Sequence, residues 1–232
     1  MCTAYIFVRG VSRCTVFCMP YPSKTDRQTI LSAAVKELAH GGIRDLSLRN
    51  IAASLGLAPN AIYRYFSDRR ALEAALADEA ARQLELALRK AADGCEPVTA
   101  IREMSSAYIK FARNNRHLYE AMMGLHAPGH DATSHQSLWA FTVEQVQRIA
   151  GSDRAAQASV ALWAFLHGAV ALEAAQVLGE IKPASGIEFG FEAWLMAAST
   201  GGEPIDALRI QATKKRARKK ESKRESSVRS GQ

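Results

Sequence analysis

The chain has 232 residues, of which 48% are hydrophobic, and a formal net charge of +7. Its 15 Gly and 7 Pro exclude a fibrous or wholly low-complexity chain, and its length suits one large domain or two smaller ones. Residues 214–232 hold nine Lys or Arg and two Glu, a net of +7, so residues 1–213 are neutral on balance. The overall basicity is therefore a property of the tail and does not by itself indicate a nucleic-acid binder.

The spacing of the cysteines does not suggest a disulfide framework. Three of the four lie within the first eighteen residues, where no histidine accompanies them, namely Cys2, Cys14 and Cys18. The fourth, Cys95, is distant in the sequence. This spacing does not suit a zinc site, so we expect no metal, no cofactor and free thiols in a reducing cytoplasm.

The opening apolar run is interrupted by Arg9 and Arg13, is too short to span a membrane and lacks a signal-peptidase site. No other uninterrupted apolar stretch of 18 residues occurs, so we expect a soluble, cytoplasmic protein. For residues 1–23 two interpretations stay open. They form a disordered arm, or translation starts at Met19 and residues 1–18 are not made.

Helical spacing begins after Asp26, where apolar residues recur every four positions from Ile30. Thr25 or Asp26 can cap this first helix, and Gly41-Gly42 supplies the positive φ that ends it. Ser47 is a good cap for a second, two-turn helix that ends at Gly56. A third short helix is predicted from Pro59 to about Phe66, since proline suits a first helical turn. Ser67 or Asp68 then caps a long helix that runs to about Ala92.

Two short helices joined by a glycine-containing turn form a helix-turn-helix, and the steric requirements of that motif are met here. Ala52 is small where the two helices cross, Gly56 takes the turn, and Ile62 is the apolar residue between the helices. Beyond the break at residues 94–97 we predict helices at about 98–113, 115–124, 133–150, 153–179 and 187–200. The predicted fold class is all-α.

Residues 27–72, RQTILSAAVKELAHGGIRDLSLRNIAASLGLAPNAIYRYFSDRRAL, resemble the DNA-binding domain of the TetR (tetracycline-repressor) family of transcriptional regulators. The resemblance depends on the G-x-x-x-L-[ST]-x-R-x-I-A core and the Y-x-x-F ending. It implies three DNA-binding helices followed by a larger bundle that dimerises and often binds a small molecule. Trp163-x-x-x-His167-Gly168 resembles the WHG-type C-terminal domain found in part of the family.

The expected organisation has four parts. A disordered arm covers 1–23, a DNA-binding domain covers 24–70 with its helix-turn-helix at 47–66, a ligand-binding and dimerisation domain covers 71–205, and a disordered basic tail covers 206–232. The tail lacks apolar spacing; it either adds non-specific DNA affinity or is a solvated extension.

Five Arg against two Asp give residues 44–70 a local charge of +3, which suits phosphate contacts. We expect base contacts from the start of the third helix in the major groove. The resemblance adds a base contact from the second helix and phosphate contacts. The complete expected set is Ser47, Arg49, Pro59, Asn60, Ala61, Tyr63, Arg64, Tyr65 and Arg69.

Each of these assignments has a structural alternative. In these alternatives Arg49 is only a solvated surface charge, Asn60 only assists the start of the helix, and Tyr63 and Tyr65 are core aromatics. The sequence also departs from the family pattern, with Tyr65 where His is common and Arg69 where Lys is common. Both replacements keep a phosphate donor.

The C-terminal half offers candidates for an effector pocket, although each is also a plausible core residue. They are Met104, Tyr108, Phe111, Tyr119, Met122, Met123, Trp139 and Phe141. The nearly all-apolar stretch 153–179 needs cover on every side, which a second subunit can provide. By resemblance the expected homodimer interface includes Trp163, His167, Gly168, Phe191 and Trp194.

His126, His130 and His135 invite a metal interpretation, but no carboxylate or cysteine cluster completes a site. No G-x-S-x-G, H-E-x-x-H, P-loop or dinucleotide fingerprint occurs, so we do not expect an enzyme. The leading hypothesis is a dimeric regulator, a repressor released from a palindromic DNA operator by a small apolar effector. The alternative is a DNA-binding regulator whose C-terminal half only dimerises or binds proteins, without an effector.

Overall fold

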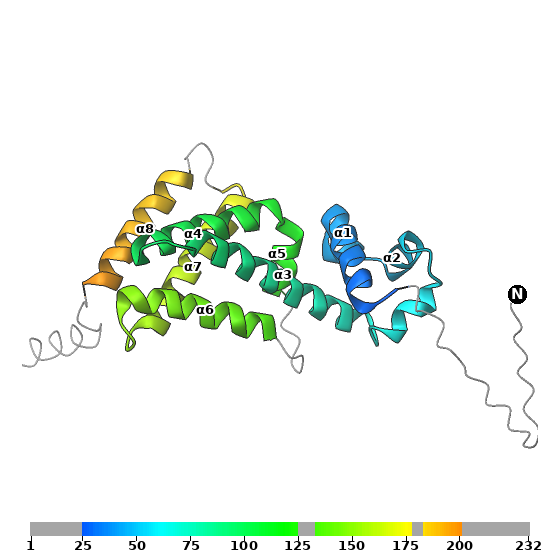
Figure 1. Cartoon of the computed structure of the whole chain (residues 1–232). Helices are drawn as coiled ribbons and strands as arrows, with labels where there is room; N and C mark the ends of the chain where they lie inside the picture. The colour runs from blue at the N-terminus through cyan, green and yellow to red at the C-terminus, as the bar shows by residue number, and fades with distance from the viewer. Residues whose placement is uncertain (1–24, 125–132, 178–182, 201–232) are drawn as a thin grey trace, which may run out of the picture.

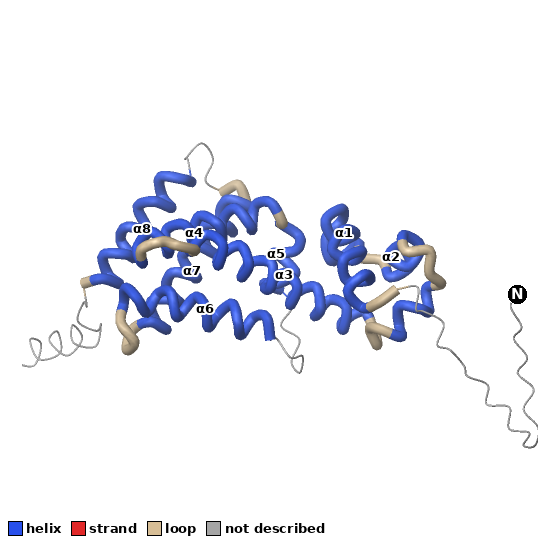
Figure 2. Tube along the Cα trace, in the orientation of Figure 1, coloured by secondary structure: helices blue, strands red, loops and turns tan. Residues whose placement is uncertain are grey.

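The computed structural model describes residues 25–124, 133–177 and 183–200. Every regular element in these ranges is a helix (Figures 1 and 2). The N-terminal domain contains α1 (Arg27–Asp45), α2 (Leu48–Ser54) and the short 3-10 helix η1 (Pro59–Arg64). The long helix α3 (Arg69–Ala92) leads from it into the larger bundle, as Figure 1 shows. The all-α prediction is confirmed.

The larger bundle comprises α4 (Pro97–Asn114), α5 (Arg116–Gly124), α6 (Thr133–Ala150), α7 (Ala155–Ala174) and α8 (Pro183–Ser199). Helix α3 packs against α4, α5 and α6, and α7 packs between α6 and α8. The expected arm at 1–23 and tail at 206–232 lie outside the described residues.

Side-chain caps fix the starts of the N-terminal helices. Asp26 accepts a hydrogen bond from the Thr29 amide at 2.6 Å, Ser47 accepts from Asn50 at 3.3 Å, and Asp68 accepts from Ala71 at 2.8 Å. The Thr29 hydrogen bonds hold the pKa of Asp26 below its usual value. Each cap satisfies an amide that the first helical turn leaves unpaired.

Several predicted boundaries differ from the structure. The first helix, expected to end at Gly41-Gly42, is kinked at Gly42 and runs on to Asp45. The third helix ends at Arg64. It is a 3-10 helix, because its amides bond to carbonyls three residues back, as Ala61 does to Ala58 at 2.9 Å. Helix α7 stops at Ala174, and Gln176 takes a positive φ of 55°. Helix α8 starts four residues before its predicted position, at Pro183, where proline suits a first turn.

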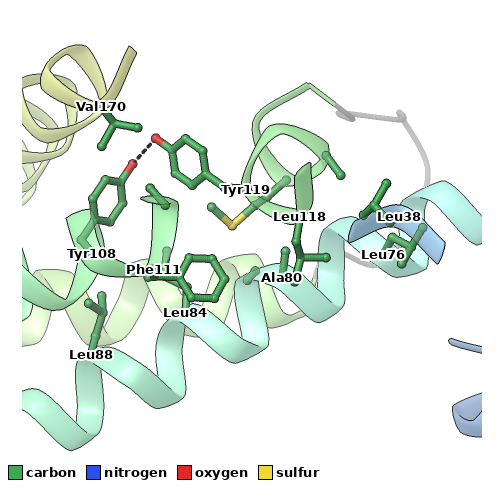
Figure 3. Packing of buried hydrophobic residues seen from close by; sticks show 14 of the residues in the cluster. Leu38, Leu76, Ala80, Leu84, Leu88, Tyr108, Phe111, Leu118, Tyr119 and Val170 are labelled. Atoms are coloured by element: carbon green, nitrogen blue, oxygen red, sulfur yellow. Dashed lines mark hydrogen bonds between the residues drawn. The ribbon is translucent and has the colours of Figure 1, made fainter. Parts of the chain in front are cut away.

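A single apolar core runs through both domains. Leu38 of α1, Leu76 of α3 and Leu118 of α5 are all buried where the two domains meet (Figure 3). Because α1 packs directly on both α3 and α5, the N-terminal domain does not hang from a single linker.

Gly42 interrupts α1 at this junction. Its φ is 73°, and a Cβ there would lie 3.0 Å from Nδ1 of His117 on α5. Gly94 has a similar φ of 67° but nothing within 4 Å of its Cβ position. The two glycines thus share the backbone requirement and differ in whether a second helix lies against them.

We expect Gly42→Ala to lower the free energy of unfolding by more than the roughly 1–3 kcal/mol that a sparsely populated positive-φ backbone costs a residue with a Cβ. Gly94→Ala, at a positive-φ glycine with nothing within 4 Å of its Cβ position, is the control without a neighbouring helix. Urea denaturation of both variants measures the difference. Equal losses in the two variants would show that the contact of Gly42 with His117 has no energetic weight.

Candidate functional site

The α2–η1 unit is held from within by a small apolar centre. Ile51 and Ala52 of α2 and Ile62 of η1 are almost completely buried, and Gly56 makes the turn at φ 64°. Asn50 also donates to Glu37 of α1 at 2.8 Å. The orientation of η1 is therefore fixed by burial on its inner side, which leaves its outer side available for contact.

Most of the predicted DNA-contacting side chains lie on this outer side. Arg49, Pro59, Asn60 and Arg64 are exposed, and Tyr63 is 51% exposed despite its aromatic ring. Ala61 is half-buried, as is Ser47, whose hydroxyl caps α2. The structure therefore leaves the carboxamide of Asn60, the guanidinium groups of Arg49 and Arg64 and the phenol of Tyr63 accessible to solvent.

Tyr65 and Arg69 differ from these residues because both side chains already bind other groups of the domain, although Arg69 is exposed. The Tyr65 hydroxyl donates to the Thr25 carbonyl at 2.8 Å. Arg69 donates to the Ile43 carbonyl at 2.5 Å and pairs with Glu73 at 2.7 Å. These bonds tie the end of η1 and the start of α3 to α1. A phosphate contact from either side chain would have to replace them.

A cavity of about 280 Å³ lies in the larger domain, with walls from α3, α4, α5, α6 and α7. Five of the eight expected pocket residues line it: Met104, Tyr108, Met122, Met123 and Trp139. The other three, Phe111, Tyr119 and Phe141, are buried in the core instead. Leucines complete the walls, among them Leu84, Leu88, Leu138 and Leu162. No sequence signal distinguishes these leucines from ordinary core residues.

A chain of hydrogen bonds runs beside the cavity. The hydroxyls of Tyr108 and Tyr119 lie 2.8 Å apart, as Figure 3 shows, and the Tyr119 hydroxyl lies 2.6 Å from Nδ1 of His167. Burial, followed by the hydrogen bond with Tyr119, raises the pKa of Tyr108 far above its usual value. Burial also raises the pKa of Tyr119. Both phenols therefore stay neutral at physiological pH.

Helices α7 and α8 present apolar side chains to solvent. Only 33% of the most apolar 18-residue window of α7 is buried, and that helix has the length and composition of a membrane span, as some core helices do. The exposed apolar side chains are Val160, Trp163, Leu172, Phe189 and Met196.

The other expected interface residues are placed differently. Phe191 and Trp194 are buried within the chain itself, where the Trp194 indole donates to the Ala158 carbonyl at 2.9 Å. His167 and Gly168 are half-buried. Gly190 allows α8 to cross α7 closely, since a Cβ there would lie 2.2 Å from the Phe165 ring.

His135 lines the cavity, whereas His126 and His130 lie outside the described residues. Among the residues that the structure does describe, no group of three or more His, Cys, Asp or Glu is placed to hold a metal ion.

A capped helix-turn-helix with an exposed basic and polar surface, joined to a helical domain with an internal cavity, defines the class of helix-turn-helix transcriptional regulators. Residues 30–76 match the family model of bacterial regulatory proteins, tetR family, and residues 101–192 match the tetracyclin repressor-like, C-terminal domain. The chain belongs to the TetR family of transcriptional regulators. Regulators of this family are DNA-binding transcription factors without enzymatic activity.

Similar proteins agree with this assignment. An uncharacterized HTH-type transcriptional regulator of Haemophilus influenzae is 28% identical over 99 residues, which are 42% of this chain and 48% of that protein. The chain thus spans about half the length of this curated relative. A solved structure of a protein of unknown function from Rhodococcus sp. RHA1 is 26% identical with a TM-score of 0.68, and the match covers 78% of this chain and 100% of the other.

A TetR variant from Acinetobacter baumannii AYE, solved in complex with minocycline, is 18% identical with a TM-score of 0.56. The match covers 75% of this chain and 96% of the other. This likeness shows the shared fold alone.

The placement of Tyr63 and Tyr65 predicts that removing each hydroxyl changes a different property, DNA binding for Tyr63 and stability for Tyr65. Tyr65→Phe should lower the free energy of unfolding by about 0.5–1.5 kcal/mol, because it removes the bond to Thr25. Tyr63→Phe should leave stability unchanged and weaken DNA binding, because that hydroxyl is on the exposed surface. Thermal denaturation and DNA-binding titrations of both variants test this. The same pattern of effects in both variants would contradict the separation of roles.

Proposed function

We propose that the chain is a homodimeric repressor that binds a palindromic DNA operator in the cytoplasm and is released by a small apolar effector. The observation that carries the DNA-binding part is the exposed surface of α2 and η1, which presents Arg49, Asn60 and Arg64 on a buried support. Repression and dimerisation are typical of the family.

In this proposal η1 enters the major groove with its N-terminal residues against the base edges. Asn60 pairs with an adenine edge, Ala61 contacts a thymine methyl group and Arg49 binds guanine. Tyr63 and Arg64 contact phosphates, together with Ser47, and Tyr65 and Arg69 take part only if they exchange their bonds within the domain. Arg44 and Arg70, both exposed, add positive charge nearby.

The exposed apolar faces of α7 and α8 support a dimer in which each helix packs on its partner copy. Trp163, Phe189 and Met196 are each more than a third exposed, so burial against a second subunit removes a large apolar area from water. A dimer with two-fold symmetry presents two copies of η1, which would require operator half-sites about one helical turn apart.

The cavity supports the effector part of the proposal, because its wall includes Leu84 and Leu88 of α3, the helix whose first turns lie in the DNA-binding domain. A ligand that binds better to a conformation with differently spaced η1 copies shifts the population away from the operator-bound state. The A. baumannii protein of the same fold binds minocycline. Without such a cavity, a C-terminal half that only dimerises would be the simpler explanation.

Base contacts by Arg49 and Asn60 predict a loss of sequence preference. On an operator identified by sequencing bound genomic DNA, Arg49→Ala and Asn60→Ala should each cost about 1–3 kcal/mol of binding free energy, with little loss on a scrambled duplex. Arg148→Ala, which removes an exposed arginine of α6, is the control for general charge. Fluorescence anisotropy on both duplexes gives the comparison. Equal losses on operator and scrambled DNA would assign these residues to phosphate contacts.

The proposed dimer predicts that Phe189→Asp combined with Met196→Asp yields a monomer that binds operator DNA more weakly. Charges at these positions have to be desolvated in the interface but stay hydrated in the monomer. Leu86→Asp, at an exposed leucine of α3, should leave the mass unchanged. Size-exclusion chromatography with light scattering measures the mass, and a double variant that still elutes as a dimer would place the interface elsewhere.

A further inference from the structure

The charges around the cavity restrict the kind of molecule it can hold. None of the described residues that line it is Lys, Arg, Asp or Glu, and they include one imidazole, that of His135. Glu85, which lies between the lining residues Leu84 and Leu88 on α3, is already paired: it binds Arg89 at 2.7 Å and Ser137 at 2.8 Å. An ionic group entering the cavity would therefore lose its water without gaining a fixed partner of opposite charge.

The hydroxyls of the wall are engaged as well. Ser105 donates to the carbonyl of Ile101 at 2.8 Å, and Thr142 donates to that of Leu138 at 2.8 Å, each one turn back in its own helix. The Tyr108 hydroxyl pairs with Tyr119. These hydroxyl donors are used inside the protein, so apart from the indoles of Trp139 and Trp163 and the imidazole of His135 the wall offers a ligand carbon surface together with a few acceptor lone pairs.

The volume sets the size of the ligand. An engineered apolar cavity of about 150 Å³ stays dry and binds benzene. The cavity here, about 280 Å³, is nearly twice as large. Two or three rings, or an aliphatic chain of similar volume, would fill it.

We propose that the cavity binds uncharged, largely hydrocarbon ligands of two to three rings and discriminates against the same skeleton when it bears an ionised group. This inference rests on the proposed effector function and adds the chemical class of the effector. Burial of apolar surface supplies the affinity, and the uncompensated desolvation of a charge supplies the discrimination.

Two fluorescent probes with one skeleton test the charge rule directly. N-phenyl-1-naphthylamine is neutral, and 1-anilinonaphthalene-8-sulfonate carries a permanent negative charge. Titrated into the full-length protein, the neutral probe should bind at least about tenfold more tightly. Equal or tighter binding of the sulfonate would overturn the proposal.

Two variant pairs locate the binding. Leu162→Trp fills the cavity from α7 and should abolish binding of the neutral probe, whereas Leu86→Trp adds the same indole at an exposed site and should not. Thr142→Arg places a cation in the wall and should shift the preference toward the sulfonate, whereas Gln147→Arg places the same cation on the exposed side of α6 and should not. Circular dichroism confirms that each variant is folded. Loss of binding in the Leu86 variant, or an unchanged preference in a folded Thr142 variant, would place the probes outside this cavity and refute the inference.

DNA binding is measured separately, so the two proposals can fail independently. If the neutral probe binds as expected but leaves operator affinity unchanged, the ligand class stands and release by that ligand is refuted. If an anionic or cationic compound releases the operator by binding in this cavity, release stands and the ligand class is refuted.

Discussion

Helix α3 is packed into the cores of both domains, and the rest of the structure depends on this double packing. Its first turns place Leu72 and Leu76 in the core of the DNA-binding domain, and its later turns place Leu84 and Leu88 against the cavity. Two glutamates on the buried side are each paired. Glu79 binds Arg82 and Gln83, and the Arg82 hydrogen bond keeps the pKa of Glu79 below its usual value. Helix α3 therefore joins the cavity wall to the N-terminal domain as one continuous helix.

The helices around α3 provide two further connections. Helix α6 is tied to α3 by Ser134, whose amide and hydroxyl both bind the carboxylate of Asp78 at 2.9 Å. Helix α5 lies against α1 at Gly42, where a Cβ would lie 3.0 Å from the His117 ring. Under the proposed effector function, a ligand that displaces α6 would strain its bonds to α3, and a shift of α5 would press on α1. Both contacts would then carry the proposed response from the cavity to the spacing of the recognition elements.

Charge has a different role in the two domains. The N-terminal domain leaves Arg49 and Arg64 on its surface, whereas the guanidinium of Arg69, also exposed, already binds the Ile43 carbonyl and Glu73, so the local excess of arginine does not translate directly into phosphate contacts. In the C-terminal domain, exposed ion pairs link helices, since Arg102 binds Glu188 and Glu192 of α8 and Arg113 binds Glu173 of α7. The described residues of α3 to α7 that line the cavity include no Lys, Arg, Asp or Glu, which is what makes its ligand preference testable.

The sequence by itself determined the helical class, the helix-turn-helix, its Ser47 cap and its Gly56 turn, because these act through local backbone geometry. It left Thr25 or Asp26 and Ser67 or Asp68 open as caps, and the structure has Asp26 and Asp68. It also identified most of the exposed surface of α2 and η1. Only the tertiary structure decided that Tyr65 and Arg69 bind carbonyl groups far away in the chain, since the positions of those acceptors depend on how α1 packs. In the C-terminal domain, Met104 lines the cavity while Phe111 is buried core, although both lie on α4 and are equally apolar. Which face of a helix meets empty space is set by the crossing of its neighbours, and no local pattern carries that information.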